Sequence, residues 1–245
     1  MNAVHNKLII ALDVETADHA RLLVASLRGI AGMFKIGSQL FTAAGPELVR
    51  EVIRGGEKVF LDLKFHDIPN TVAAAGVEAT RLGVSMFNVH AAGGSPMMSR
   101  TATAVSECAE REGFVRPVVL GVTILTSSND AVLSEVGLRE NSAEMVRRLA
   151  QLAAQSGLDG VVASAREVTL VREVTKAGFV VVTPGVRPAV SGNDDQARVM
   201  SPRDAIAAGA DYLVVGRPII AAPDPARAAQ QIFEEMQKSV TATSV

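Results

Sequence analysis

The chain has 245 residues, of which 48% are hydrophobic and 20% are charged. These proportions are typical of a globular protein and exclude a disordered or collagen-like chain. The chain has 24 basic and 26 acidic residues, so its net charge of −2 provides no overall positive field to attract nucleic acid or an anionic membrane. We therefore expect a small-molecule partner, with no nucleic acid and no membrane.

The sequence shows no secretory or membrane-spanning segment. The apolar run near the N-terminus, residues 8–14, is too short for the core of a signal peptide, and uninterrupted apolar stretches of about 18 residues do not occur. The single cysteine, Cys108, has no second thiol for a disulfide and is expected to be a structural residue of a helix. We expect the protein to be cytoplasmic.

Eight apolar segments predict β-strands. In chain order they are 8–14, 33–37, 58–64, 86–90, 116–124, 160–164, 179–185 and 212–216. Between them, segments such as 17–27, 70–83 and 142–157 repeat apolar residues every three or four positions, as on one face of a helix. Glycines such as Gly83 and Gly157 stand just before the next strand, in a position that ends many helices.

This alternation of strand and helix predicts an α/β protein with a single-domain (β/α)8 barrel. The length agrees, because such barrels run to about 250 residues as one domain. A doubly wound open sheet would have the same periodicity, but the chain lacks the glycine-rich turn of a dinucleotide-binding fold. We expect one domain over residues 1–245, with a mobile phosphate-gripping loop at about 184–200 and a short irregular C-terminal tail.

Charged residues gather where three of the predicted strands end. Asp62 and Lys64 are two residues apart in VFLDLKF, so they should point to the same side, into the barrel. Asp13 ends the first strand, and Lys35 lies within the second. A structural salt bridge would account for one pair alone, although a buried ion pair often adds nothing to stability. Four charges that meet at the catalytic end of a barrel instead predict an active site with an alternating, hydrogen-bonded row.

The segments after the third, seventh and eighth strands carry further signals. Pro69 should open a helix, and Asp67 and Thr71 could serve as its cap. The last two strands end in TPGVRP and VVGRPI, which combine glycine with arginine where such barrels commonly bind phosphate. Gly216 and Arg217 therefore predict a phosphorylated ligand.

The four histidines lack the spacing of metal ligands, so we expect no metal site.

These segments together resemble the orotidine 5′-phosphate decarboxylase family. FLDLKFHDIPNTV matches the family signature closely, and ALDV, FKIG, LTS, PGVRP, DDQ and VVGRPI follow in the family's order and spacing. The segment DLKFHDIPNT is highly specific, whereas the phosphate elements are shared with many barrels. The resemblance implies conversion of orotidine 5′-phosphate to uridine 5′-phosphate (UMP) and CO2 in pyrimidine biosynthesis, without a cofactor or metal.

The resemblance also implies the catalytic residues and the oligomeric state. Lys35, Asp62, Lys64 and Asp67 would form the charged row, and Lys64 would donate the proton to C6 of the pyrimidine ring. Asp67 and Thr71 would reach across a two-fold interface into the neighbouring site, which makes the active unit a homodimer.

The substrate-binding residues are likewise implied by the resemblance. Asp13 and Lys35 would hold the ribose hydroxyls, and Thr126 would contact the pyrimidine edge. Arg187, Gly216 and Arg217 would bind the phosphate, and Gln196 would contact both phosphate and base. In chain order they are Asp13, Lys35, Asp62, Thr71, Thr126, Arg187, Gln196, Gly216 and Arg217.

Three other functions fit parts of the pattern. Sugar-phosphate decarboxylases and synthases of the same barrel type share an Asp-x-Lys-x-x-Asp core but look magnesium-dependent, and the continuation FHDIPNT argues against them. A Schiff-base aldolase using Lys64 is disfavoured, because neighbouring carboxylates would keep that lysine charged. A non-catalytic sensor of nucleotide phosphates would not need an intact charged row.

Overall fold

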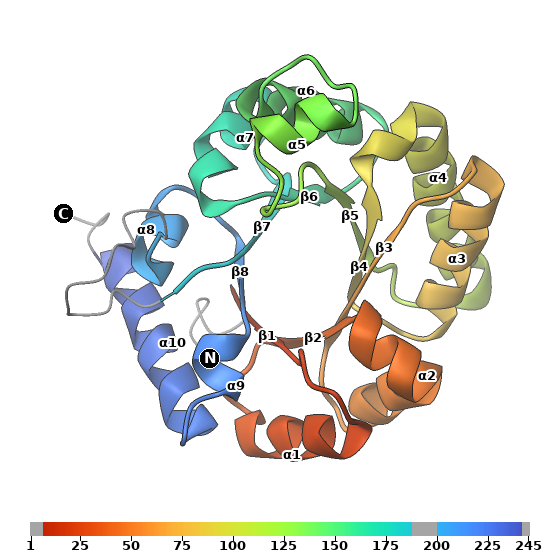
Figure 1. Cartoon of the computed structure of the whole chain (residues 1–245). Coiled ribbons are helices and arrows are strands. Elements are labelled where there is room, and N and C mark those ends of the chain that lie inside the picture. Colours follow the sequence, from red (N-terminus) through yellow and green to blue (C-terminus); the bar gives the residue numbers. More distant parts are fainter. Residues whose placement is uncertain (1–6, 188–199, 242–245) are drawn as a thin grey trace.

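Eight parallel strands form a closed barrel in the order β1 to β8 (Figure 1). The computed structural model describes residues 7–187 and 200–241. The strands are β1 (Leu8–Ala11), β2 (Met33–Gly37), β3 (Val59–Phe65), β4 (Met86–His90), β5 (Val118–Val122), β6 (Gly160–Val162), β7 (Val180–Pro184) and β8 (Tyr212–Val215). Each strand lies where the sequence predicts one, and the predicted (β/α)8 barrel is confirmed.

Helices surround the barrel on its outside (Figure 1). They are α1 (Ala17–Leu27), α2 (Ser38–Arg54), α3 (Pro69–Arg81), α4 (Gly94–Glu112), α5 (Asp130–Glu135), α6 (Ser142–Gln155), α7 (Val168–Val174), α8 (Pro202–Ala207), α9 (Arg217–Ile220) and α10 (Pro225–Thr241), with short 3-10 turns η2 (Ala91–Gly93) and η3 (Ala165–Glu167). Within the described ranges, no helix has the length and apolar character needed to span a membrane.

Local signals explain where the helices begin and end. The Thr16 side chain accepts a hydrogen bond from the backbone N–H of His19 and so caps α1, which has the predicted bounds. Pro69 opens α3, as predicted, because a first-turn residue needs no N–H partner within the helix. Gly83 has a φ of 80°, which ends the helical segment in a conformation that favours glycine.

Two expectations concern the C-terminal tail and the loop after the seventh strand. Helix α10 runs to Thr241, so an irregular C-terminal tail could begin only after that residue. Most of the loop expected at about 184–200, including Gln196, lies outside the described residues. Cys108 is fully buried and unpaired within α4, in keeping with a structural role.

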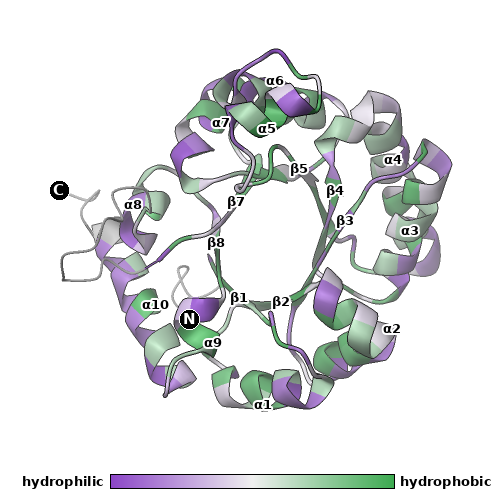
Figure 2. Cartoon of the chain, in the orientation of Figure 1, coloured by the Kyte–Doolittle hydropathy of each residue, from purple (hydrophilic) through white to green (hydrophobic). Residues whose placement is uncertain are grey.

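The barrel has an apolar layer on each side of its strands. Figure 2 shows that hydrophobic residues, in green, recur along the strands. The inner layer is formed by Ile9, Ala11, Met33, Phe60, Met86, Leu120, Val182 and Val214. The neighbouring strand residues face outward and pack with the helices in a larger cluster. Since side chains alternate along a strand, the inward positions two residues beyond Met33, Phe60 and Met86 are Lys35, Asp62 and Asn88. The apolar inner layer therefore supports a polar layer at the C-terminal ends of the strands.

Candidate active site

A cavity of about 390 Å³ lies at the C-terminal ends of the strands. This volume lies within the range of small-molecule sites. The cavity is lined by eight of the predicted site residues, namely Asp13, Lys35, Asp62, Lys64, Thr126, Arg187, Gly216 and Arg217. Its described lining does not include Asp67 or Thr71, and Gln196 lies outside the described residues.

Four of these side chains form a continuous row of alternating charge. Lys35 Nζ lies 2.9 Å from Asp13 Oδ1 and 3.2 Å from Asp62 Oδ2. The other oxygen of Asp62, Oδ1, lies 2.6 Å from Lys64 Nζ. The row therefore runs Asp13, Lys35, Asp62, Lys64, and each of its two inner members contacts two opposite charges.

The strands place Lys35 and Asp62 side by side. Residues two positions earlier on β2 and β3, Met33 and Phe60, belong to the inner apolar layer, so both charged side chains rise from the same face. A Cβ atom at Gly37 would lie only 3.1 Å from Lys35 Nζ, so the glycine leaves room for the ammonium. The glycine of FKIG is thus part of the site, which the sequence analysis did not recognise.

Burial and charge oppose each other at the centre of the row. Burial favours the neutral form of Lys35, but attraction to Asp62 and Asp13 outweighs it and raises the lysine pKa above 10.5. Burial likewise favours the neutral form of Asp62, but attraction to Lys35 and Lys64, together with hydrogen bonds from Lys64 and Asn88, lowers its pKa below 3.8. Both groups are therefore charged at neutral pH.

Lys64 reaches the cavity from an irregular part of β3. Its φ is 52°, and it is the one non-glycine residue with a positive φ in the part of the chain that the structure describes. The pairing of β3 with β4 also changes register between Leu61 and Phe65. The expectation that Lys64 and Asp62 point the same way is met, but the regular strand alternation from which it was argued is interrupted at this point.

The rest of the cavity combines an apolar wall with a second cationic region. Apolar side chains from several strand ends line it, among them Val122, Ile124, Leu125, Val162, Val186 and Val214. Thr126 follows the fifth strand, Arg187 follows the seventh, and Gly216 and Arg217 follow the eighth. The charged residues of the described lining are four cationic ones, Lys35, Lys64, Arg187 and Arg217, and two anionic ones, Asp13 and Asp62, which leaves an excess of two positive charges. The cavity is suited to an anionic ligand, part of which packs against apolar side chains.

Asp67 and Thr71 lie apart from the row. Both are exposed, and Asp67 Oδ1 accepts a hydrogen bond at 2.6 Å from the backbone N–H of Ile68. The N-cap of α3 is Ile68, and no side chain caps the helix. The interpretation of Asp67 and Thr71 as a helix cap is therefore wrong, and within this chain Asp67 does not join the row of lysines and aspartates.

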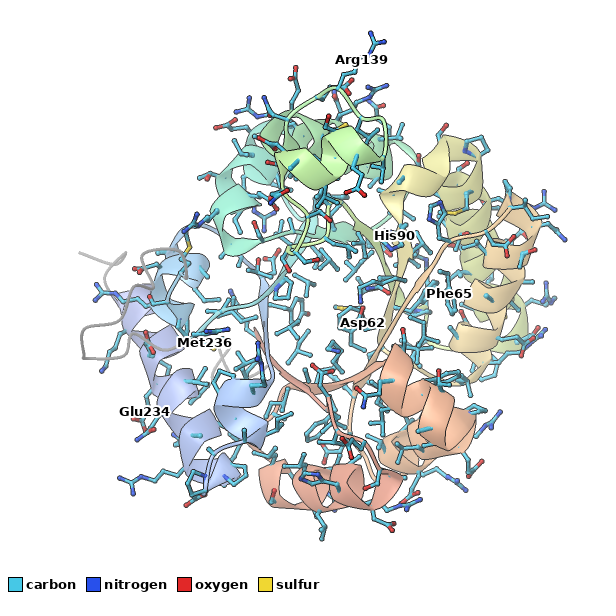
Figure 3. The ribbon with its side chains drawn as sticks, viewed as in Figure 1. Asp62, Phe65, His90, Arg139, Glu234 and Met236 are labelled. Carbon is cyan, nitrogen blue, oxygen red and sulfur yellow. The ribbon has the colours of Figure 1, made fainter. Side chains whose placement is uncertain are left out.

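Asn88 is a buried polar residue that the sequence analysis missed. It is fully buried on β4, and its Nδ2 donates to Asp62 Oδ1 at 2.7 Å. Figure 3 shows Asp62 inside the barrel, near His90 at the end of β4, while Phe65 lies on the outer side toward α3. The signal was present in MFNVH, where a polar residue occupies an inward position of an apolar strand.

Among the described residues there is no group of three or more His, Cys, Asp or Glu side chains that could hold a metal ion.

The comparisons with known proteins agree on one family. Residues 6–232 match the model of the orotidine 5′-phosphate decarboxylase / HUMPS family. Proteins named orotidine 5′-phosphate decarboxylase from Syntrophotalea carbinolica and Geobacter sulfurreducens are 58% and 54% identical over 230 residues, 94% of this chain and 94% and 95% of theirs.

The fold comparison gives the same result. The crystal structure of orotidine 5′-phosphate decarboxylase from Lactobacillus acidophilus has a TM-score of 0.83 and 36% sequence identity, over 94% of this chain and 98% of that one. The corresponding enzyme from Pyrococcus horikoshii has a TM-score of 0.73 and 25% identity, over 94% and 99%. The chain belongs to the orotidine 5′-phosphate decarboxylase / HUMPS family.

Proposed function

We propose that the protein converts orotidine 5′-phosphate to UMP and CO2 in pyrimidine biosynthesis, without a metal, and that Lys64 protonates C6 of the pyrimidine ring. The observation that carries this proposal is the row Asp13, Lys35, Asp62, Lys64 along a cavity with a net excess of positive charge. The matches to proteins named orotidine 5′-phosphate decarboxylase support the reaction.

The chemistry requires a cation close to C6. Loss of CO2 breaks the bond between C6 and the carboxylate and leaves an electron pair in an sp² orbital, which the ring cannot delocalise. An ammonium about 4 Å from such a charge supplies about 4 kcal/mol at an effective dielectric near 20. Lys64 lines the cavity and can provide this charge, and transfer of its proton to C6 completes UMP. The two lysines supply positive charge without a metal.

Asp62 has a different role in this scheme. Its carboxylate stays ionised because Lys35 and Lys64 lower its pKa. Placed beside the substrate carboxylate it repels that group, and the repulsion ends when neutral CO2 leaves. Asp62 also fixes the ammonium of Lys64, since the two groups are 2.6 Å apart. The same carboxylate thus favours departure of CO2 and orients the proton donor.

The charge balance of the cavity fits the substrate. The phosphate and carboxylate of orotidine 5′-phosphate are anionic, and the described lining has an excess of two positive charges. In the proposal Arg187, Gly216 and Arg217 bind the phosphate, since guanidinium groups pair well with phosphate oxygens. Thr126 contacts the pyrimidine edge, and Gln196 the phosphate and the base. Binding energy from the phosphate is then available to the chemical step.

The proposal includes a cytoplasmic homodimer in which Asp67 and Thr71 complete the neighbouring site. Their exposure on the loop before α3 and on its first turn leaves them free to meet a second subunit. Mixing Lys64→Ala with Asp67→Ala tests this, because a heterodimer has one barrel with an intact lysine and a partner's intact aspartate. Random subunit exchange should restore roughly one quarter of wild-type sites. No recovery, with exchange verified by mass spectrometry, would place Asp67 outside the partner's site.

The test of the reaction is a spectrophotometric assay of purified protein with orotidine 5′-phosphate in EDTA. We expect the orotate absorbance to change to that of UMP at a rate unaffected by the chelator. Activity that is lost in EDTA and restored by Mg²⁺ would instead favour a sugar-phosphate decarboxylase or synthase mechanism. Binding of the nucleotide without any spectral change would indicate a sensor, and borohydride trapping with a carbonyl substrate would reveal an aldolase.

A further inference from the structure

We infer that Asn88 is a positioning residue for the decarboxylation, because it holds the Asp62 carboxylate and the Lys64 backbone in one arrangement. The inference rests on the proposed function. Asn88 does not line the cavity and is fully buried, so it acts through the two residues that do.

The first observation is a bulge opposite Asn88. Leu61 pairs with Phe87, and Phe65 pairs with Val89. Three residues of β3, 62–64, therefore stand opposite a single residue of β4, Asn88. Such a bulge interrupts the ladder of backbone hydrogen bonds and leaves groups of the longer strand without a strand partner. A buried N–H group needs another acceptor in its place.

Asn88 supplies that acceptor. Its Oδ1 accepts the backbone N–H of Lys64 at 2.8 Å. Lys64 has a φ of 52°, in the left-handed region that a residue with a long side chain rarely occupies. Such a conformation persists only where the surrounding structure holds it. We conclude that the Asn88 carbonyl stabilises the backbone turn that directs the Lys64 side chain into the cavity.

The other half of the same amide holds the carboxylate. Asn88 Nδ2 donates at 2.7 Å to Asp62 Oδ1, the oxygen that also accepts from Lys64 Nζ. Rotation of the amide by 180° would place its NH2 group against the Lys64 N–H and its oxygen against the Asp62 carboxylate. Both bonds would be lost, so their donors and acceptors fix the amide orientation. The neutral Asn88 side chain thus bonds both to the backbone of the proton donor, Lys64, and to the neighbouring carboxylate, Asp62.

The test compares Asn88→Ala and Asn88→Asp with wild type, and Thr183→Val as a control. Thr183 is also buried on a barrel strand, and among the described residues its hydroxyl has no hydrogen-bond partner. We expect Asn88→Ala to lower kcat about 10- to 100-fold, the range for a lost hydrogen bond to a charged group. KM and the affinity for UMP should change less than about threefold, because the phosphate contacts remain. The control should keep its kcat.

Asn88→Asp separates positioning from general destabilisation. The introduced carboxyl, when protonated, can still accept the Lys64 N–H and donate to Asp62, whereas its ionised form would repel that carboxylate. Of the titratable residues, Asp62 and Lys64 on β3 contact position 88, and Lys35 on β2 contacts Asp62. His90 on β4 lies against His66, with ring centroids 5.4 Å apart. Burial and the Asp62 charge raise the pKa of the introduced carboxyl, and the lysines oppose this. The ratio of variant to wild-type kcat should therefore rise as the pH falls.

The outcomes distinguish this inference from the proposed function. If wild type does not convert orotidine 5′-phosphate, the proposed function fails. If wild type is active and Asn88→Ala keeps its kcat, or the Asn88→Asp ratio does not depend on pH, the positioning role is wrong. Should Asn88→Ala not fold, the nearly isosteric Asn88→Asp decides alone. A crystal structure of either variant adds a direct check, because Lys64 should leave its left-handed conformation or its contact with Asp62.

Discussion

Lys35→Met removes one positive charge from the row and keeps an apolar stem of similar length. The exposed fraction of the Asp13 side chain is 54%, so water screens the loss of that contact, whereas the Asp62 side chain is only 12% exposed. Removing one partner of a buried ion pair costs about 3–5 kcal/mol. Because Lys64 and Asn88 still bind Asp62, we expect the lower end, about 3 kcal/mol of unfolding free energy at neutral pH.

The pH dependence of this loss has a definite sign. The wild-type pKa of Asp62 is lowered in the folded state, so its stabilising contribution is present above 3.8 and is lost as the pH falls through the folded pKa. In Lys35→Met the largest attraction on that carboxylate is gone, and its folded pKa should rise. The difference in unfolding free energy between wild type and variant should therefore be greatest near neutral pH and shrink toward about pH 4.

The assay is urea denaturation at several pH values, with Arg147→Met as a matched control. Arg147 pairs with Glu173 at the surface, where both side chains are about half exposed, so its loss should cost less than about 1 kcal/mol. If Lys35→Met is no more destabilising than this control, or if its deficit grows as the pH falls, the description of Lys35 as the buried centre of the row is wrong.

Three further predictions concern the phosphate region, the barrel and the strand next to the row. Arg217→Ala should raise KM for orotidine 5′-phosphate about 10- to 100-fold and leave turnover of the nucleoside orotidine unchanged in steady-state assays. Gly160→Ala should lower stability by about 3 kcal/mol in thermal unfolding, since a Cβ atom would lie 2.2 Å from the Val180 carbonyl oxygen. The pKa of His90 is lowered below 6.5 by burial, then by His66 and Lys64, so its contribution is present above that value and lost as the pH falls. His90→Gln should therefore flatten the unfolding free energy between neutral pH and about pH 5. An unchanged KM, melting temperature or pH slope, respectively, would contradict each prediction.

The sequence was sufficient to predict the barrel because each strand is marked by a short apolar run. Buried parallel strands need apolar residues on both sides, and the intervening helices need them on one face only. These two patterns separate clearly in this chain. The end of the first strand was less clear, since β1 stops at Ala11 and Asp13 lies just beyond it. Hydrogen bonding, which the sequence does not reveal, determines that boundary.

The arrangement at Lys64 could not be predicted in the same way. Alternation along a regular strand indicates the correct face for Asp62 and Lys64, but a positive φ is usually signalled by glycine, and here the residue is lysine. At the bulge the Lys64 N–H bonds to Asn88, which is 24 residues away in the chain. Such long-range contacts are set by packing between strands and leave no local pattern in the sequence.

The position of Asp67 and Thr71 shows a different limit. Their residue types suit a helix cap, and the same types suit a contribution to a second subunit. The structure of one chain excludes the cap, since Ile68 occupies that position. The subunit-mixing experiment with Lys64→Ala and Asp67→Ala tests the other role.

The most direct measurement of the central claim compares catalysis and binding by Lys64→Ala. If Lys64 stabilises the carbanion and supplies its proton, kcat for orotidine 5′-phosphate should fall by at least about 10⁴-fold. The affinity for UMP, measured by calorimetry, should change less than about tenfold, because Arg187 and Arg217 are intact. A folded Lys64→Ala variant with near-normal kcat would contradict the account.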